Sequence, residues 1–196
     1  MYIGVDFDNT IVSYDELFWR AATEQGLMVE ETPHTKLAIR DGLRAQGGEA
    51  AWIALQARVY GPLIREAPIF AGVLEFFATC STLGVPTVII SHKTRVAGDA
   101  VYDLHQAARS WLTAQGLGVP AHFEVTRAAK LKRIELEGCT HFIDDLPEVL
   151  ADPGFPAGVE PILFDPFVQH GVSAQFKHMT SWVEMQDLVV SAATPK

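Results

Sequence analysis

The stretch Val5-Asp6-Phe7-Asp8-Asn9-Thr10-Ile11 decides how the rest of the chain is interpreted. It follows an apolar run at residues 2–5 that has the length and composition of a β-strand. Two carboxylates two residues apart come directly after this run. A solvated strand end or an Asx-type turn produces a similar pattern. The alternative is a pair of acids held at the end of a buried strand for acid–base or nucleophilic chemistry.

A second apolar strand pattern also ends in paired acids, at Phe142-Ile143-Asp144-Asp145. Neighbouring carboxylates repel each other, so the pair costs free energy unless a cation offsets it. Asp145 before Leu146-Pro147-Glu148 also fits a helix N-cap followed by proline in the first turn. In a parallel sheet, the acids of both stretches would meet at one edge. Their oxygen atoms would suit Mg²⁺ there.

Two further polar groups follow strand patterns. The first is Ser91-His92-Lys93-Thr94-Arg95, which offers a hydroxyl, backbone amides and cations to the oxygens of a phosphoryl group. Ser91 simply ending the strand is the alternative interpretation. The second group holds Lys130 and Lys132, either of which could neutralise the carboxylates. A solvated helix face would explain both lysines equally well.

Strand and helix patterns alternate along most of the chain. Strands are expected at residues 2–5, 86–90, 122–125, 140–143 and 161–164. Helices are expected at residues 72–83, 99–115, 130–137 and 181–192. This alternation predicts an α/β fold, a Rossmann-like parallel sheet with helices on both faces. Ligands of such sheets bind outside the carboxyl ends of the strands, where the polar groups occur here.

One segment, from Tyr14 to Glu66, has no strand pattern. Its helical patterns cover residues 15–25, 37–45 and 50–66, with breaks at Gly47-Gly48 and Gly61-Pro62. An insertion of about 50 residues is too long for a crossover loop in this type of fold. We therefore expect a small all-helical cap at residues 14–66. The α/β core is expected to consist of residues 1–13 and 67–196.

Composition limits the function classes. The 196 residues are 48% hydrophobic and 20% charged, which is typical of a globular protein. A net charge of -9 without a Lys/Arg cluster disfavours binding to nucleic acid or to an anionic membrane. Two cysteines, Cys80 and Cys139, are too few for a disulfide framework, and no signal sequence or membrane span is recognisable. We expect a cytoplasmic protein with a frayed tail at residues 192–196, and the sequence predicts no oligomeric state.

In their order, the four polar stretches resemble the motifs of the haloacid dehalogenase superfamily of phosphohydrolases. Residues 6–10 resemble its first motif, Ser91 its second, Lys130 or Lys132 its third, and Asp144-Asp145 its fourth. The resemblance covers the whole expected core, and residues 14–66 stand in the place of the superfamily's cap. Lys130 is closer to Asp144 than is usual in the superfamily, which leaves Lys132 as an alternative. His92 replaces an Asn that often follows the second motif.

The resemblance implies a Mg²⁺-dependent phosphatase acting on a small phosphorylated metabolite, such as a sugar or nucleoside phosphate. Asp6 would be the nucleophile and Asp8 the general acid and base, assisted by Ser91 and Lys130. The superfamily's simple dehalogenases lack the second Asp, so Asp8 favours phosphoryl transfer. A polynucleotide or protein phosphatase, and a non-catalytic regulatory protein with the same fold, are the alternatives.

The resemblance also implies two sets of binding residues. Mg²⁺ would be held by the Asp6 carboxylate, the Asp8 main-chain carbonyl and Asp145, with Asp144 as a further ligand or a supporting residue. Phosphate or substrate would be held by Phe7 through its amide, Asn9, Thr10, Ser91, His92, Lys93, Arg95 and Lys130.

Overall fold

A computed structural model of the chain describes residues 1–27, 32–98, 101–171 and 175–193. The chain forms two compact units. The α/β unit consists of residues 1–11, 69–92 and 117–196, and the helical unit of residues 12–68 and 93–116.

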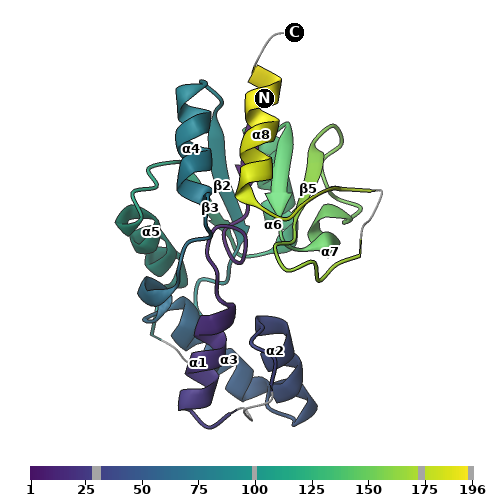
Figure 1. Ribbon diagram of the computed structural model, residues 1–196. Helices are drawn as coiled ribbons and strands as arrows, with labels where there is room; N and C mark the ends of the chain where they lie inside the picture. Colours follow the sequence, from purple (N-terminus) through teal and green to yellow (C-terminus); the bar gives the residue numbers. More distant parts are fainter. Residues whose placement is uncertain (28–31, 99–100, 172–174, 194–196) are drawn as a thin grey trace. The chain divides into compact units, whose positions relative to one another are not determined.

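The α/β unit is built on a six-stranded sheet with the order β3-β2-β1-β4-β5-β6, in which every neighbouring pair is parallel (Figure 1). The strands are β1 (Ile3–Val5), β2 (Thr87–His92), β3 (Ala121–Glu124), β4 (His141–Asp144), β5 (Glu160–Phe164) and β6 (Lys177–Met179). All five predicted strands are present, which confirms the parallel α/β fold. The strand β6 was not predicted, because Lys177-His178-Met179 is short and mostly polar.

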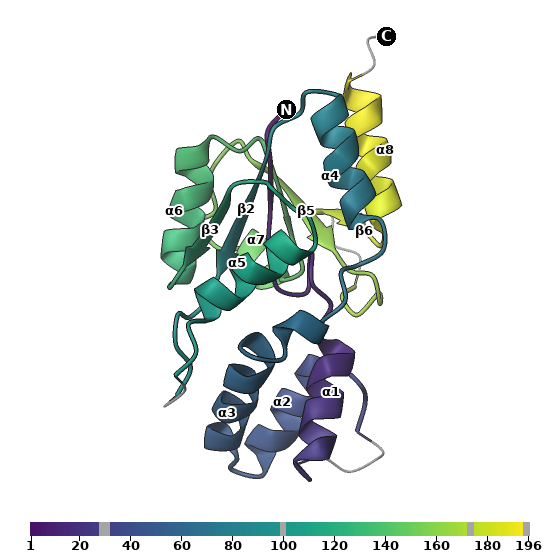
Figure 2. The same cartoon turned by 90° about the vertical axis from the view of Figure 1, so that its left-hand side faces the viewer.

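Helices cover both faces of this sheet. The helices of the unit are α4 (Val73–Thr82), α6 (Arg127–Glu137), α7 (Pro147–Leu150) and α8 (Trp182–Ala193). Helix α6 covers one face, and α4 and α8, packed against each other, cover the opposite face (Figure 2). The predicted Rossmann-like layering is therefore confirmed. The tail that was expected to fray lies mostly outside the described residues.

The core of the α/β unit follows from the alternation of side chains along each strand. Val88, Ile90 and Phe142 point to one face and pack with buried residues of α6 and α7. Gly4 lies between them, and a Cβ atom there would come within 2.5 Å of the Phe142 ring. Glycine is therefore needed at this position for β1 to pair with β4 while Phe142 fills the core.

The helical unit contains only helices as regular elements in its described residues. They are α1 (Asp15–Glu24), α2 (Lys36–Ala45), α3 (Glu49–Tyr60), the 3₁₀ turn η1 (Ile64–Glu66) and α5 (Leu104–Ala114). Its core contains an aromatic cluster, in which the rings of Phe18 and Trp52 stack at 5.2 Å and those of Tyr14 and Tyr60 meet edge-on at 4.9 Å. The predicted helix at residues 50–66 is interrupted after Tyr60, where Gly61-Pro62 ends α3.

The division of the chain differs from the expected one in the placement of α5. Residues 93–116 were expected in the core, but they group with the helical unit. Helix α5 packs against α3 and η1, and the buried Trp111 indole donates a hydrogen bond to the Ala67 carbonyl at 3.0 Å. The helix begins at Leu104, because the Asp103 carboxylate caps it by accepting from the Gln106 N–H. Residues 99–100 of the predicted helix lie outside the described residues.

Across the described ranges, no helix is both long and apolar enough to cross a membrane.

Candidate active site

Asp6 is placed by the pairing of β1 with β4. It follows β1 directly, only 4% of its surface is exposed, and its N–H donates to the Ile143 carbonyl at 2.8 Å. Val5 pairs with Ile143, so the residues that follow them, Asp6 and Asp144, lie side by side. Sheet register therefore brings together two of the acids that the sequence predicted to converge.

Lys130 lies between these two carboxylates. Its Nζ atom is 2.5 Å from Asp6 Oδ1 and 2.6 Å from Asp144 Oδ2. Helix α6 begins at Arg127, because the Thr126 hydroxyl accepts from the Ala129 N–H and caps the helix. Lys130 therefore lies in the first turn of α6 and is buried. The alternative lysine, Lys132, is exposed and pairs with Glu135 at 2.7 Å, so the structure brings Lys130 and not Lys132 to the acids.

The carboxylates form the one group of potential metal ligands found among the described residues. Oxygen atoms of Asp6, Asp144 and Asp145 lie within 4.8 Å of one another. Asp144 is fully buried, and its two oxygens accept from Lys130 Nζ and from the Leu146 N–H. Asp145 is half-buried and accepts from the Thr10 hydroxyl at 3.5 Å. The predicted N-cap role of Asp145 is not observed, because Leu146 is the N-cap residue of α7.

The carboxylate cluster carries more negative than positive charge. Burial, with smaller contributions from the charges of Asp144 and Asp8, raises the pKa of Asp6 to about 7 despite the lowering effect of Lys130. Although burial opposes it, the pairing with Asp144 and Asp6 raises the pKa of Lys130, which therefore stays charged. A single ammonium group thus faces several carboxylates. A bound cation would favour the ionised form of Asp6.

Two buried polar atoms near the carboxyl ends of β1 and β2 lack hydrogen-bond partners within the described part of the chain. They are Ser91 Oγ and Asn9 Oδ1. Ser91 is 1% exposed, and Asn9 adopts a left-handed conformation with φ of 59° in the loop after β1. Leaving such atoms unpaired costs free energy. Unpaired buried polar atoms at the carboxyl ends of neighbouring parallel strands are typical of a site that binds a polar ligand.

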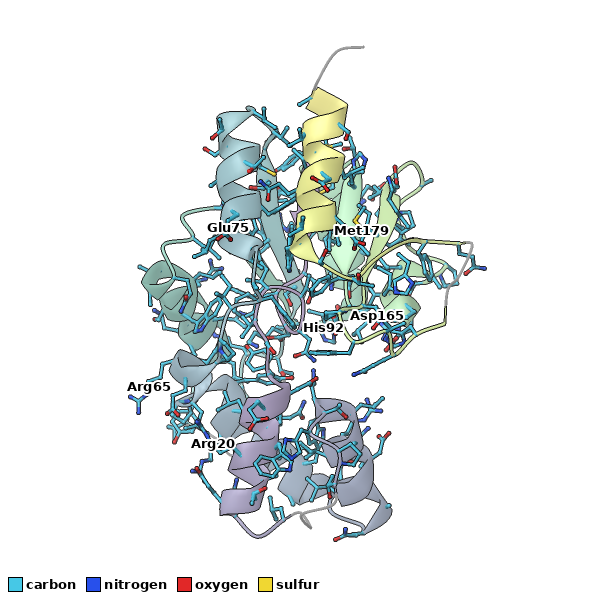
Figure 3. The ribbon with its side chains drawn as sticks, viewed as in Figure 1. Arg20, Arg65, Glu75, His92, Asp165 and Met179 are labelled. Atoms are coloured by element: carbon cyan, nitrogen blue, oxygen red, sulfur yellow. The ribbon has the colours of Figure 1, made fainter. Side chains whose placement is uncertain are left out.

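His92 ends β2, with an exposed side chain (Figure 3). Partial desolvation of its ring and the charges of Lys130 and Arg127 lower its pKa. The imidazole is therefore neutral at pH 7. It can donate one hydrogen bond and accept another.

The other predicted residues of this loop have different surroundings. Asp8 is half-buried, and it is close enough to Asp6 for its charge to affect the pKa of that residue. The Phe7 side chain is buried edge-on against Phe123 at 5.4 Å, and the Phe7 carbonyl accepts from the Ile11 N–H at 3.0 Å. Thr10 is fully buried.

Lys93 and Arg95 belong to the helical unit. The Lys93 Nζ atom lies 4.1 Å from the centroid of the Tyr60 ring, and Arg95 pairs with Asp103 at 2.9 Å. Their predicted contacts with phosphate or substrate remain predictions.

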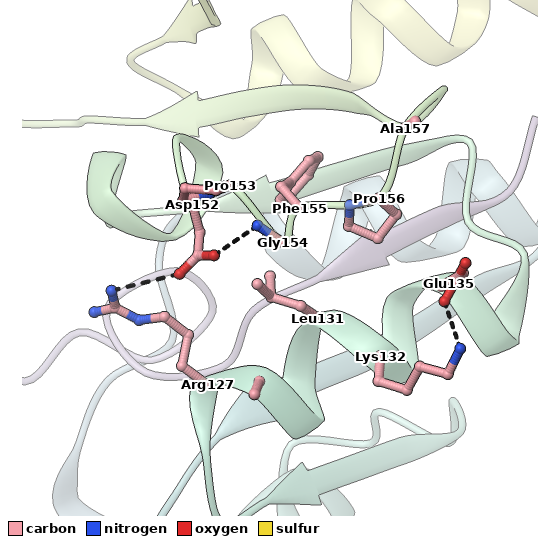
Figure 4. A pocket seen from close by; sticks show the side chains of 11 residues that line it. Arg127, Leu131, Lys132, Glu135, Asp152, Pro153, Gly154, Phe155, Pro156 and Ala157 are labelled. Carbon is pink, nitrogen blue, oxygen red and sulfur yellow. Dashed lines mark hydrogen bonds and ion pairs between the residues drawn. The ribbon is translucent and has the colours of Figure 1, made fainter.

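A surface groove of about 650 Å³ lies apart from the carboxylate cluster, between α6 and residues 152–157 (Figure 4). Lys132 is the one predicted site residue among those described as lining it. Ion pairs join Arg127 to Asp152 at 3.9 Å and Lys132 to Glu135 at 2.7 Å. The charges of the groove are therefore largely matched within it.

Sequence reasoning missed one contact of the site. Trp182 lies in the helix predicted at residues 181–192, and its indole N–H donates to the Thr10 carbonyl at 3.2 Å. The two residues are 172 positions apart. No local pattern could have revealed the bond.

Comparisons with known proteins bear on the fold. No family model and no curated protein matches the sequence. Among solved structures, a haloacid dehalogenase family hydrolase from Deinococcus radiodurans, with bound phosphate and sodium, has a TM-score of 0.61 at 15% identity, covering 100% of this chain and 98% of that one.

Two further structures are similar over almost their whole length. A haloacid dehalogenase superfamily hydrolase from Ehrlichia chaffeensis has a TM-score of 0.60 at 14% identity, covering 98% of this chain and 97% of that one. A dehalogenase has a TM-score of 0.59 at 12% identity, covering 95% and 96%. Identities this low establish the fold and not the reaction. The chain has the fold of the haloacid dehalogenase superfamily hydrolases.

Proposed function

We propose that this protein is a Mg²⁺-dependent phosphohydrolase that acts on a small phosphorylated metabolite, such as a sugar or nucleoside phosphate. The observation that carries the proposal is the position of Lys130, buried between the carboxylates of Asp6 and Asp144, which form one cluster with Asp145. A buried cation there is suited to a reaction in which a carboxylate meets a phosphate dianion, because the two anions repel each other.

In the proposed reaction, an Asp6 oxygen attacks phosphorus in line and the bond from phosphorus to the leaving oxygen breaks. Asp8 gives its proton to the leaving oxygen, which departs as an alcohol. Water then attacks the aspartyl-phosphate while Asp8 takes a proton from it, and the bond from phosphorus to Asp6 breaks. Asp6 is restored and inorganic phosphate is released.

Phosphoryl oxygens need donors during both steps. The unpaired Ser91 hydroxyl, the Phe7 amide and Lys130 would supply them. The neutral His92 imidazole at the end of β2 is suited to the leaving group. Lys93 and Arg95 are proposed as further contacts to substrate.

The residues present fit a divalent cation. Oxygen ligands converge, the local charge is negative, and burial opposes ionisation of Asp6. The Asp6 carboxylate, the Asp8 main-chain carbonyl and Asp145 would hold Mg²⁺. Asp144 would support them, because both of its oxygens already accept hydrogen bonds. When bound, Mg²⁺ supplies positive charge that offsets the repulsion between nucleophile and phosphate.

The choice of reaction and substrate rests on two features. Asp8 favours phosphoryl transfer, since cleavage of a carbon–halogen bond needs no acid at that position. The net charge of -9 disfavours a polynucleotide, whose phosphates would be repelled. A small phosphate ester therefore fits best, and we propose a cytoplasmic location for its turnover.

Phosphate release from a panel of sugar, nucleoside and polyol phosphates tests the proposal. Each reaction is run with Mg²⁺, with EDTA, and with the Asp6→Asn variant. Turnover that requires both Mg²⁺ and Asp6 would support it. Mg²⁺-independent turnover, or release of halide from a 2-haloacid in place of phosphate, would contradict it. Mg²⁺ binding without release from any ester, including a phosphopeptide and a 3′-phosphorylated oligonucleotide, would favour a non-catalytic role.

A further inference from the structure

We propose that Trp182, the first residue of α8, is a positioning residue for the metal site: its indole N–H holds the main chain of the loop that carries Asp6 and Asp8. The inference rests on the proposed function. It adds a requirement that the motifs do not contain, namely that the last helix of the chain sets the geometry of the first motif.

The contact is direct and fully buried. Trp182 Nε1 donates to the Thr10 carbonyl at 3.2 Å, with Trp182 1% and Thr10 0% exposed. The Thr10 hydroxyl donates in turn to Asp145 Oδ1 at 3.5 Å. Thr10 therefore connects the indole, through its main chain, with a predicted metal ligand. It also lies two residues after Asp8, whose carbonyl is a second predicted ligand.

The indole ring is fixed in position by its neighbours. Gly72, with φ of +90°, lies against the Cβ and main chain of Trp182, where a Cβ atom at Gly72 would be 2.9 Å from the Trp182 Cβ. The rings of Phe76 and Phe164 pack on Trp182 at 4.9 and 5.5 Å. A ring held on several sides has one direction for its N–H. That direction is toward Thr10.

The start of α8 is also held in place. The Glu184 carboxylate accepts from the Thr180 N–H at 2.6 Å and from the Ser181 N–H at 3.1 Å. These bonds satisfy donors at the helix N-terminus and keep the first turn from fraying. Trp182 therefore projects from a well-anchored turn.

A purely structural role for Trp182 makes a different prediction. If the residue only fills the core, its replacement by Phe lowers the stability of the protein and leaves the affinity for Mg²⁺ unchanged. If it positions the loop, the same replacement weakens Mg²⁺ binding as well, because the Thr10 carbonyl loses its donor and the loop can shift.

The test is the affinity for Mg²⁺ alone, measured by calorimetry without substrate on the wild-type chain and on Trp182→Phe. Loss of one hydrogen bond predicts about three- to tenfold weaker binding. Trp111→Phe is the matched control: its indole also donates to a buried main-chain carbonyl, that of Ala67 at 3.0 Å, but within the helical unit. We expect wild-type affinity for this control. Equal affinity of Trp182→Phe and wild type, or an equal loss in both variants, would overturn the inference.

A second measurement needs no variant to fold. In wild-type protein labelled with ¹⁵N at the indole, Mg²⁺ should shift the Trp182 N–H resonance more than that of Trp111. An unmoved Trp182 resonance under saturating Mg²⁺ would overturn the inference. Because both measurements omit substrate, absence of phosphatase turnover with a Trp182-dependent Mg²⁺ affinity would refute the proposed reaction alone.

Discussion

The site predicts that the ionised Asp6 carboxylate lowers the stability of the metal-free protein. Asp6→Asn replaces the carboxyl with a neutral group of similar shape. In the folded state, burial raises the pKa of Asp6 from 3.8 to about 7. The unfolded chain therefore releases this proton at a lower pH than the folded one, and folding stability falls as the pH rises from about 4 to about 7.

The size of this stability difference follows from the pH interval between the two pKa values. A pKa shift from 3.8 to about 7, at 1.36 kcal/mol for each pH unit, corresponds to about 4 kcal/mol. Because Asn resembles the protonated carboxyl, the variant should be more stable than wild type by about 4 kcal/mol at pH 8 and by less than half of that at pH 5.

Urea unfolding at these two pH values, with EDTA present, measures the effect through tryptophan fluorescence. A repeat with Mg²⁺ should stabilise the wild-type chain more than the variant, because a bound cation favours the ionised carboxylate. A variant less stable than wild type at both pH values would refute the reasoning, as would a gain that does not change with pH.

Three other substitutions test individual roles. Asp8→Asn should lower turnover by about 10²–10⁴-fold, the usual contribution of acid–base catalysis, with little change in Mg²⁺ affinity; full activity would exclude Asp8 as the acid. Lys130→Met should destabilise the protein by about 3–5 kcal/mol at pH 8, because it leaves buried carboxylates unpaired. The exposed Lys132→Met is its control and should change stability by less than about 0.5 kcal/mol; similar losses in both would contradict the placement of Lys130. Ser91→Ala should raise KM for a phosphate ester without lowering stability, since the Ser91 hydroxyl has no partner to lose among the described residues; a stability loss with unchanged KM would show a structural role.

Much of the fold is predictable because each strand pattern is a local property. The apolar runs at β1, β2 and β4 are buried on both faces, so their sequences are apolar without interruption and easily recognised. The strand β6 was not predicted, because its pairing with β5 depends on its position at the edge of the sheet and not on a pattern in its own three residues. The predicted start of this helix was residue 130, whereas α6 begins at Arg127, directly after the recognisable N-cap residue Thr126.

The site was predictable to the extent that it lies at strand ends. Parallel pairing places Asp6 beside Asp144 once both strands are recognised. The choice between Lys130 and Lys132 required the phase of α6, which turns Lys130 inward and Lys132 to the surface. The Trp182 bond to Thr10 depends on packing between distant segments. Sequence pattern carries no information on such packing.

The most direct test of the central claim is to trap the covalent intermediate. The protein is mixed with the best substrate and Mg²⁺, quenched in acid, and treated with borohydride, which reduces an acyl phosphate to an alcohol. Peptide mass spectrometry should then find homoserine at position 6 and an unchanged residue at position 8. Reduction at another carboxylate, or an unmodified Asp6 during steady turnover, would contradict the assignment of Asp6 as the nucleophile.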